Sequence, residues 1–150
     1  ILRKSEPLTP EEWATMRKHP STGADIIATM PRLEEVGNIV RYHHERYDGA
    51  GYPEGLNGEE IPVGARLLAV ADAFDTMTTK RSYSDAVSLE AAVDELRKCS
   101  GKQFSALAVE AFICGLMKQK QFVLEHIRAP RGRVILPGGL VLRGGRVPNL

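Results

Sequence analysis

The chain has 150 residues and a formal net charge of +1, and its composition, 43% hydrophobic and 26% charged, is that of one globular domain with a real core. The balanced charge gives no global field that would attract a polyanion, so no DNA partner is expected, and no apolar run reaches the roughly 18 residues of a membrane span. Cys99 and Cys114 form no CxxC pair, which argues against a disulfide framework or a zinc ribbon and favours a reducing cytoplasm.

A capping box predicts where the first helix starts. Thr9 is a good N-cap, a proline follows it, and Glu12 stands where its side chain can bond back to the N-cap. Pro20 disfavours the α conformation at His19, so the first helix is expected to end there. A second short helix is expected over residues 21–30.

A third helix is expected over residues 32–44, because apolar residues recur there at helical spacing. Its buried stripe is predicted to consist of Leu33, Val36 and Val40, with His43 and His44 on the same side one turn later. Residues 48–62 hold four glycines and two prolines and show no helix or strand period. This segment is therefore predicted to be a structured loop.

The next helix, over residues 63–79, is apolar nearly all round, which predicts a central and buried position. Ser88 and Ser105 are predicted N-caps of two further helices, and helical structure is expected to reach about Ile127. The inward faces of these two helices are predicted to carry Leu89, Ala92, Val93 and Leu96, and Leu107, Ala111, Phe112 and Leu116. The predicted fold is an all-α bundle over residues 1–127, followed by a basic Gly/Pro-rich tail over residues 128–150 that is irregular or hairpin-like.

The adjacent pair His43 and His44 is the sharpest chemical feature of the chain. On a helix, adjacent side chains diverge by roughly 100°, so such a pair suits two neighbouring metal ions better than one. The alternative is structural: one histidine is buried and the other caps the end of the helix.

Asp72 and Asp75 stand three residues apart on the helix that is predicted to be most buried. A buried carboxylate is unfavourable unless it is paired or bound to metal, and Arg66, Lys80 or Arg81 could supply an ion pair. Combined with the histidines, metal ligation is the better account. Imidazole and carboxylate donors without thiolate suit iron, manganese, nickel or zinc at a hydrolytic site.

The loop around Tyr52 has both a functional and a structural interpretation. Fifteen residues without periodicity make a long loop for a compact domain, and such loops are more often functional than not. Glycines let backbone N–H groups approach a phosphate, and Tyr52 offers a stacking face for a base; alternatively, the segment is only a turn-rich connection. Arg81 could clamp a phosphate or be a solvated charge at a helix C-terminus.

The strings HHERYDGAGYPEGLNGEEIP and ARLLAVADAFDTMTTKRSY resemble the HD-GYP domain, the GYP-bearing branch of the HD superfamily of metal-dependent phosphohydrolases. The resemblance runs from residue 1 to about residue 112. It implies an HD-superfamily helical bundle with two or three divalent metal ions, iron or manganese before others. It also implies hydrolysis of the bacterial second messenger cyclic di-GMP to pGpG or GMP. Family members usually carry a sensory or receiver domain upstream, and a homodimer is compatible with the resemblance.

By matching position, the resemblance implies four metal ligands, which are His19, His43, His44 and Asp72. It implies substrate contacts by the GYP triplet, Gly51, Tyr52 and Pro53, and by Arg81.

The chain departs from the family pattern, because no His-Asp dipeptide occurs in its 150 residues. Two metal ligands and a catalytic lysine of the family are therefore without a match, and no catalytic residue is assigned. The first residue is Ile1, and we expect the chain to be a cyclic di-GMP phosphodiesterase domain without its N-terminal helices. The alternative is a truncated or degenerate module that binds nucleotide or a protein partner without catalysis.

Overall fold

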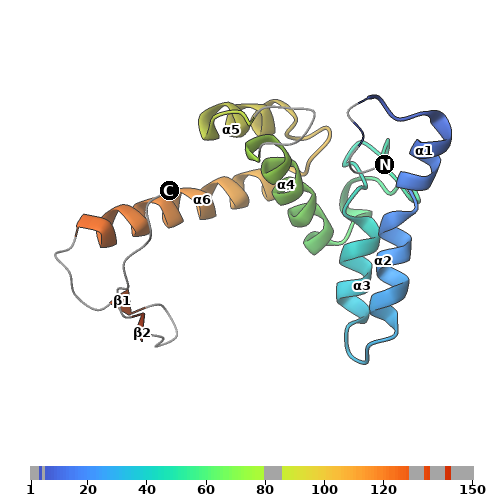
Figure 1. The fold of residues 1–150 in the computed structure, drawn as a ribbon, viewed down its shortest axis with the longest axis horizontal. Helices are drawn as coiled ribbons and strands as arrows, with labels where there is room; N and C mark the ends of the chain where they lie inside the picture. Colours follow the sequence, from blue (N-terminus) through green and yellow to red (C-terminus); the bar gives the residue numbers. More distant parts are fainter. Residues whose placement is uncertain (1–3, 5, 80–85, 129–133, 136–140, 143–150) are drawn as a thin grey trace. The chain divides into compact units, whose positions relative to one another are not determined.

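The computed structural model describes residues 4, 6–79, 86–128, 134–135 and 141–142, and helices dominate it, which confirms the predicted all-α fold (Figure 1). The helices, in chain order, are α1 (Pro10–Met16), α2 (His19–Ala28), α3 (Glu34–Tyr42), the 3-10 helix η1 (Gly58–Glu60), α4 (Val63–Thr78), α5 (Leu89–Lys98) and α6 (Ala106–Arg128). Two short strands, β1 (Val134–Ile135) and β2 (Val141–Leu142), pair antiparallel. This pairing is the hairpin-like alternative that was predicted for the tail.

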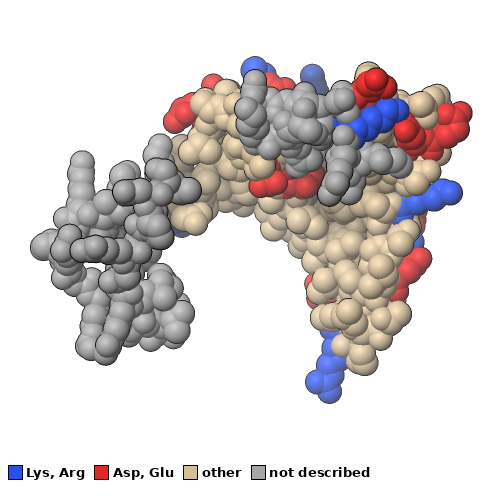
Figure 2. All heavy atoms as spheres, in the orientation of Figure 1, with Lys and Arg blue, Asp and Glu red and all other residues tan. Residues whose placement is uncertain are grey.

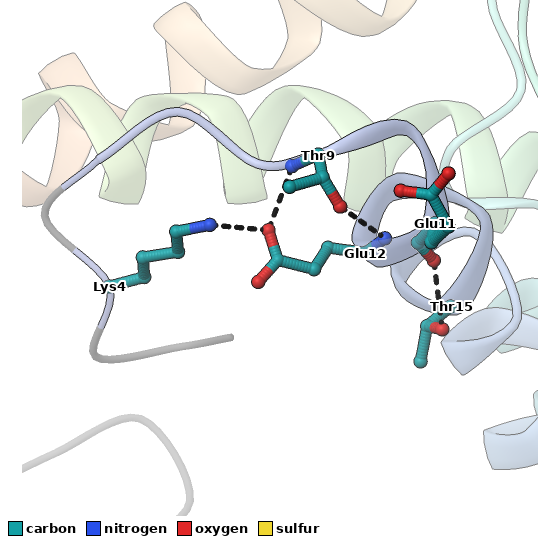
Figure 3. Close-up of polar contacts among 5 residues, drawn as sticks. All are labelled: Lys4, Thr9, Glu11, Glu12 and Thr15. Carbon is teal, nitrogen blue, oxygen red and sulfur yellow. Dashed lines mark hydrogen bonds and ion pairs between the residues drawn. The ribbon is translucent and has the colours of Figure 1, made fainter.

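The predicted capping box is present at the start of α1 (Figure 3). Thr9 Oγ1 accepts a hydrogen bond from the backbone N–H of Glu12 at 3.3 Å, and the Glu12 carboxylate accepts one from the backbone N–H of Thr9 at 2.7 Å. Lys4 adds an ion pair to the same carboxylate at 2.6 Å. Helix α2 begins at His19, two residues earlier than predicted. Pro20 lies in its first turn, where a missing N–H leaves no helical hydrogen bond unmade.

Helices α2 and α3 pack against each other as an antiparallel pair (Figure 1). Glycines allow this close approach: a Cβ atom at Gly23 would lie 3.1 Å from Val40 Cγ1, and one at Gly37 would lie 3.7 Å from the carbonyl oxygen of Ala24. The prediction that Val36 is buried was wrong, because Val36 is 42% exposed and its neighbour Gly37 is the buried residue. Leu33 and Val40 are half-buried and Val40 contacts Gly23 of α2, so the predicted stripe holds except that Gly37 takes the place of Val36.

The hydrophobic core lies among α4, α5 and the first turns of α6. The fully buried side chains at its centre are those of Val70, Leu96 and Val109, and Phe74 packs against Phe112 with 5.1 Å between ring centroids. Ser88 caps α5 as predicted, because its Oγ accepts a hydrogen bond from the backbone N–H of Ala91 at 3.1 Å. This core fixes one flank of α4, from which Asp72 projects.

The predicted inward faces are confirmed in part. On α5, Ala92 and Leu96 are buried and Val93 packs against the core, as predicted, whereas Leu89 is 47% exposed. On α6, Phe112 packs against the core as predicted, but Leu107 is 74% exposed and Ala111 is also exposed, and the buried residues are Ala108, Val109 and Ile113. The apolar face of α6 therefore begins one residue later than predicted.

Helix α4 is not buried all round, contrary to the prediction. Ala65 and Val70 are its buried residues, whereas Val63 is 61% exposed and Leu67 is 39% exposed. Its main contacts within the described residues are with α3 and α5, and they leave part of its surface uncovered. Figure 2 shows that much of the surface over α2, α3 and α4 in this view is free of charged side chains.

The chain divides into two compact units, residues 1–113 and residues 114–150. The first holds α1 to α5, the start of α6 and the core; the second holds the rest of α6 and the β1–β2 pair. Over the described residues, no helix has the length and apolarity needed to cross a membrane.

Candidate metal centre

Three histidines converge where α2 begins and α3 ends. His19 is the first residue of α2, His43 is the C-cap of α3, and His44 follows it. Their candidate ligand nitrogens lie within 4.8 Å of one another, and His44 Nε2 is 3.1 Å from His19 Nε2. The antiparallel packing of α2 on α3 thus brings together residues that are 25 positions apart in the sequence.

Backbone carbonyls fix the orientation of two of these rings. His19 Nδ1 donates a hydrogen bond to the carbonyl oxygen of Met16 at 2.7 Å, and His43 Nδ1 donates one to that of Val40 at 2.6 Å. With Nδ1 engaged by a carbonyl oxygen, Nε2 is the ring nitrogen of each residue that is left to bind a metal ion. Metal-binding histidines in proteins are held in the same way, by a hydrogen bond from the second ring nitrogen. The donor set therefore fits a divalent metal ion.

The third imidazole is kept uncharged. Burial, together with the neighbouring His43 and His19, lowers the pKa of His44 to about 4, and the negative charge of Asp72 opposes the shift. His44 is therefore neutral near pH 7, and a neutral imidazole is the form that binds metal.

The angular argument for two metal ions does not apply to this pair of histidines. It assumed that both lie on one helix, but α3 ends at Tyr42 and His44 lies beyond the cap. Their rings are 4.1 Å apart between centroids and tilted by 38°, so the two side chains do not diverge as neighbours on a helix do. The number of ions therefore rests on the family resemblance alone.

Asp72 lies on α4, outside the group of three histidines, and it is exposed rather than buried as predicted. It nevertheless borders, with His43 and His44, a cavity of about 390 Å³. Other polar residues that line this cavity are Glu45, Arg46, Thr76, Glu95, Cys99 and Gln103. Arg66, one predicted ion-pair partner of Asp72, pairs instead with Glu59 at 2.6 Å.

Gly51 of the GYP triplet occupies a position that only glycine fits. A Cβ atom there would lie 2.6 Å from the Cα of Glu45, closer than side-chain atoms approach backbone. Residue 51 is therefore glycine for a structural reason, because the loop passes close to the backbone of the segment after His44. Its contact with a substrate phosphate stays a prediction. Pro53 follows a cis peptide bond and is exposed, and Arg81 lies outside the described residues.

Tyr52 connects this loop to the histidines. Its backbone N–H donates to the carbonyl oxygen of His44 at 3.2 Å, and its ring stacks on the His44 imidazole with 5.0 Å between centroids. The guanidinium carbon of Arg17 lies 5.5 Å from the Tyr52 ring centroid. Burial raises the pKa of the Tyr52 phenol above its usual value, so Tyr52 is a neutral hydrogen-bonding group beside the site.

Glu45 is a site residue that the sequence reasoning missed. Its side chain is buried, and its two oxygens accept hydrogen bonds from the backbone N–H groups of Glu54, Gly55 and Leu56 at 2.7, 3.0 and 3.1 Å. The Glu45 carboxylate therefore anchors the loop after the GYP triplet to the backbone segment that directly follows His44. The available signal was an acidic residue directly before a glycine-rich loop, whose backbone donors need acceptors.

Comparison with known proteins gives a family. The family model for the HD domain matches residues 1–106. A cyclic di-GMP phosphodiesterase of Thermotoga maritima is 44% identical over 115 residues, which cover 75% of this chain and 31% of that protein. The cyclic di-GMP phosphodiesterase response regulator RpfG of Xanthomonas campestris is 39% identical over 123 residues, or 81% of this chain and 32% of that protein.

Among solved structures, a cyclic GMP-AMP specific phosphodiesterase of V. cholerae, V-cGAP3, matches with a TM-score of 0.62 and 25% identity over 81% of this chain and 28% of that one. The chain spans about a third of the length of these relatives. Because the HD domain match covers well over half of the residues, the chain belongs to the HD domain family, and the resemblance drawn from its paired histidines and GYP loop is confirmed.

Proposed function

We propose that this chain is the metal-binding part of a phosphodiesterase that hydrolyses cyclic di-GMP in bacterial second-messenger signalling. The observation that carries the proposal is the group of three histidines, whose ligand nitrogens lie within 4.8 Å of one another beside a cavity of about 390 Å³. The names of the relatives from T. maritima and X. campestris support the substrate class.

His19, His43, His44 and Asp72 would hold two or three divalent ions, with iron or manganese as the first candidates. When bound, such ions activate water for attack on phosphorus and offset charge on the phosphate oxygens. The chain itself supplies the preorganisation. The carbonyls of Met16 and Val40 hold two of the imidazole rings in place, and the carboxylate of Asp72 adds negative charge at the cavity wall.

The GYP loop is proposed to hold the substrate. Tyr52 stacks on His44 and borders the histidines, so a nucleotide at the metal centre would meet this ring. Gly51 and Pro53 belong to the same loop, and Arg81 is proposed as a phosphate contact on the family resemblance. A receiver domain upstream is supported by the name of the X. campestris relative, a response regulator. A homodimer and a cytoplasmic location are proposed with it.

The alternative function is nucleotide or protein binding without catalysis. One observation favours it: no His-Asp dipeptide occurs among the 150 residues, so the family's bridging carboxylate has no match here. A bridging carboxylate fixes the distance between metal ions and thereby the position of the attacking water. We therefore expect slow turnover from the 150-residue chain.

Incubation with cyclic di-GMP and Mn²⁺ or Fe²⁺, followed by chromatography of the products, tests the proposal. The variants are His44→Ala and Asp72→Ala, and Asp94→Ala, an exposed carboxylate on α5, is the control. Metal-dependent formation of pGpG or GMP that is lost in the first two variants and kept in the third supports the phosphodiesterase. Metal-dependent binding without product supports the alternative. If the chain neither retains metal nor binds cyclic di-GMP, both are refuted.

A further inference from the structure

Arg17 stands beside the histidines without a role in the fold that accounts for it. It is the C-cap of α1, lies two residues before His19, and is exposed. Its guanidinium carbon is 5.5 Å from the centroid of the Tyr52 ring, and that ring stacks on His44. A permanent positive charge is therefore held one aromatic ring away from the candidate metal ligands.

Within the described residues, no carboxylate forms an ion pair with Arg17, and three acidic side chains near the site, those of Glu45, Asp48 and Glu54, are engaged by other partners. Asp48 accepts two hydrogen bonds from Arg46, at 2.6 and 3.0 Å. Glu45 binds the loop backbone, and Glu54 accepts a hydrogen bond from Tyr42 at 3.2 Å. As far as the described part of the chain goes, the guanidinium of Arg17 therefore has donors available for a ligand that approaches over Tyr52.

A guanidinium that packs over an aromatic ring and has no acidic partner is well suited to bind a phosphate. It is charged at every physiological pH, and its planar N–H groups fit two oxygens of a phosphate at once. Packing of the cation over an aromatic ring also limits the conformations of a long side chain before the ligand arrives. Lys18, the next residue, is cationic as well, but its side chain contacts no aromatic ring among the described residues.

We propose that Arg17 binds a phosphate of the cyclic dinucleotide, while the histidines face the phosphodiester that is cleaved. This assignment rests on the proposed function, because it takes the substrate from it. Cyclic di-GMP carries two phosphodiester groups, so one can lie at the metal centre while the other meets the guanidinium. Arg17 is thereby a substrate-binding residue of the site, and Tyr52 is the platform on which its side chain lies.

The experiment compares Arg17→Ala, Arg17→Lys and the control Lys18→Ala, which removes an equal charge one residue away. Equilibrium binding of cyclic di-GMP is measured in the presence of Mn²⁺, together with KM where turnover occurs. Loss of a charge-assisted hydrogen bond predicts about 10- to 100-fold weaker binding for Arg17→Ala. Arg17→Lys should lose less, because it keeps the charge without the planar fork, and Lys18→Ala should bind as the unmodified chain does.

Two further measurements separate a phosphate contact from a structural or base contact. Bis(p-nitrophenyl) phosphate carries a single phosphate and should be hydrolysed equally by the Arg17→Ala variant and the unmodified chain. The salt dependence of cyclic di-GMP binding should be smaller in the variant, because a screened charge contact has been removed. An unchanged salt dependence, or equal losses with both substrates, would overturn the assignment to phosphate.

The outcomes also distinguish this inference from the proposed function. If Arg17→Ala binds and cleaves cyclic di-GMP as the unmodified chain does, Arg17 is not a substrate contact and the phosphodiesterase assignment stands. If binding depends on Arg17 but no product forms with any metal, the contact stands and the catalytic assignment fails. If the unmodified chain does not bind cyclic di-GMP, both are overturned.

Discussion

The carboxylate of Glu45 is expected to control how firmly the GYP loop is held. In the Glu45→Ala variant, three backbone N–H groups, those of Glu54, Gly55 and Leu56, lose their acceptor. The variant leaves every candidate metal ligand in place. The substitution at residue 45 therefore loosens the GYP loop and removes no candidate metal-ligand atom from the metal centre.

The magnitude follows from the geometry of these three hydrogen bonds. A hydrogen bond to a charged group contributes about 1.5–3 kcal/mol, so simple addition would give a loss of about 4.5–9 kcal/mol. Glu54 and Gly55 are exposed, and water can replace part of what they lose. We therefore expect about 2–4 kcal/mol for Glu45→Ala, and about 1–2 kcal/mol for Glu45→Gln, which retains one oxygen acceptor. Typical domains are stable by about 5–15 kcal/mol, so the variant should still fold.

Urea unfolding of the two variants measures these losses, and Glu54→Ala is the matched control. That control removes an acidic side chain from the same loop but keeps the backbone N–H of residue 54, so it should lose less than about 1 kcal/mol. Hydrogen exchange of the amides of residues 54–56 should accelerate in Glu45→Ala and not in the control. Equal unfolding midpoints for Glu45→Ala and Glu54→Ala, with unchanged exchange, would refute the reasoning.

Three further predictions concern single features of the fold and the site. Gly51→Ala should destabilise the domain by at least about 2 kcal/mol, because its Cβ would meet backbone; the control Gly115→Ala, in open space on α6, should be neutral or stabilise by about 0.5–1 kcal/mol in the same urea titration. Thr9→Ala should lose about 1 kcal/mol with the N-cap of α1, and Thr9→Ser should restore most of it. Mn²⁺ should raise the Tm of the unmodified chain, and a chelator should reverse this; an equal rise in His19→Ala would show that His19 is not a ligand.

The helix N-caps could be predicted from the sequence, because an N-cap is formed by residues that lie within one turn of each other in the chain. The capping box at Thr9 and the cap at Ser88 depend on side chains that reach backbone groups three residues away. The starts of α1 and α5 were therefore predicted to the residue. The start of α2 was not, because a proline such as Pro20 is compatible both with the end of one helix and with the first turn of another.

The buried faces of helices and the contacts between distant residues depend on tertiary packing, so the pattern of apolar residues in the sequence predicted them only in part. Helix α4 is rich in apolar residues, but composition does not reveal what covers each face, and Leu67 is exposed. Glu45 was overlooked because an acidic residue in a polar loop is usually solvated, whereas here the backbone folds around it. The residue types of His19, His43 and His44 suggested a shared metal site and the family resemblance assigned them as ligands, but no local period relates residues 25 positions apart, so their distances could not be predicted.

The close contact between Gly23 and Val40 has a consequence for the metal centre. Gly23 lies about one turn after His19 on α2, and Val40, whose carbonyl orients His43, lies two residues before the end of α3. An apolar contact in which no ligand takes part thus lies between the two helices that position the nitrogen donors. A methyl group at position 23 would lie 3.1 Å from Val40 Cγ1, so the Val40 side chain or the helix pair must give by a few tenths of an ångström. Where the helices give, the spacing of the donors changes while every coordinating side chain stays the same.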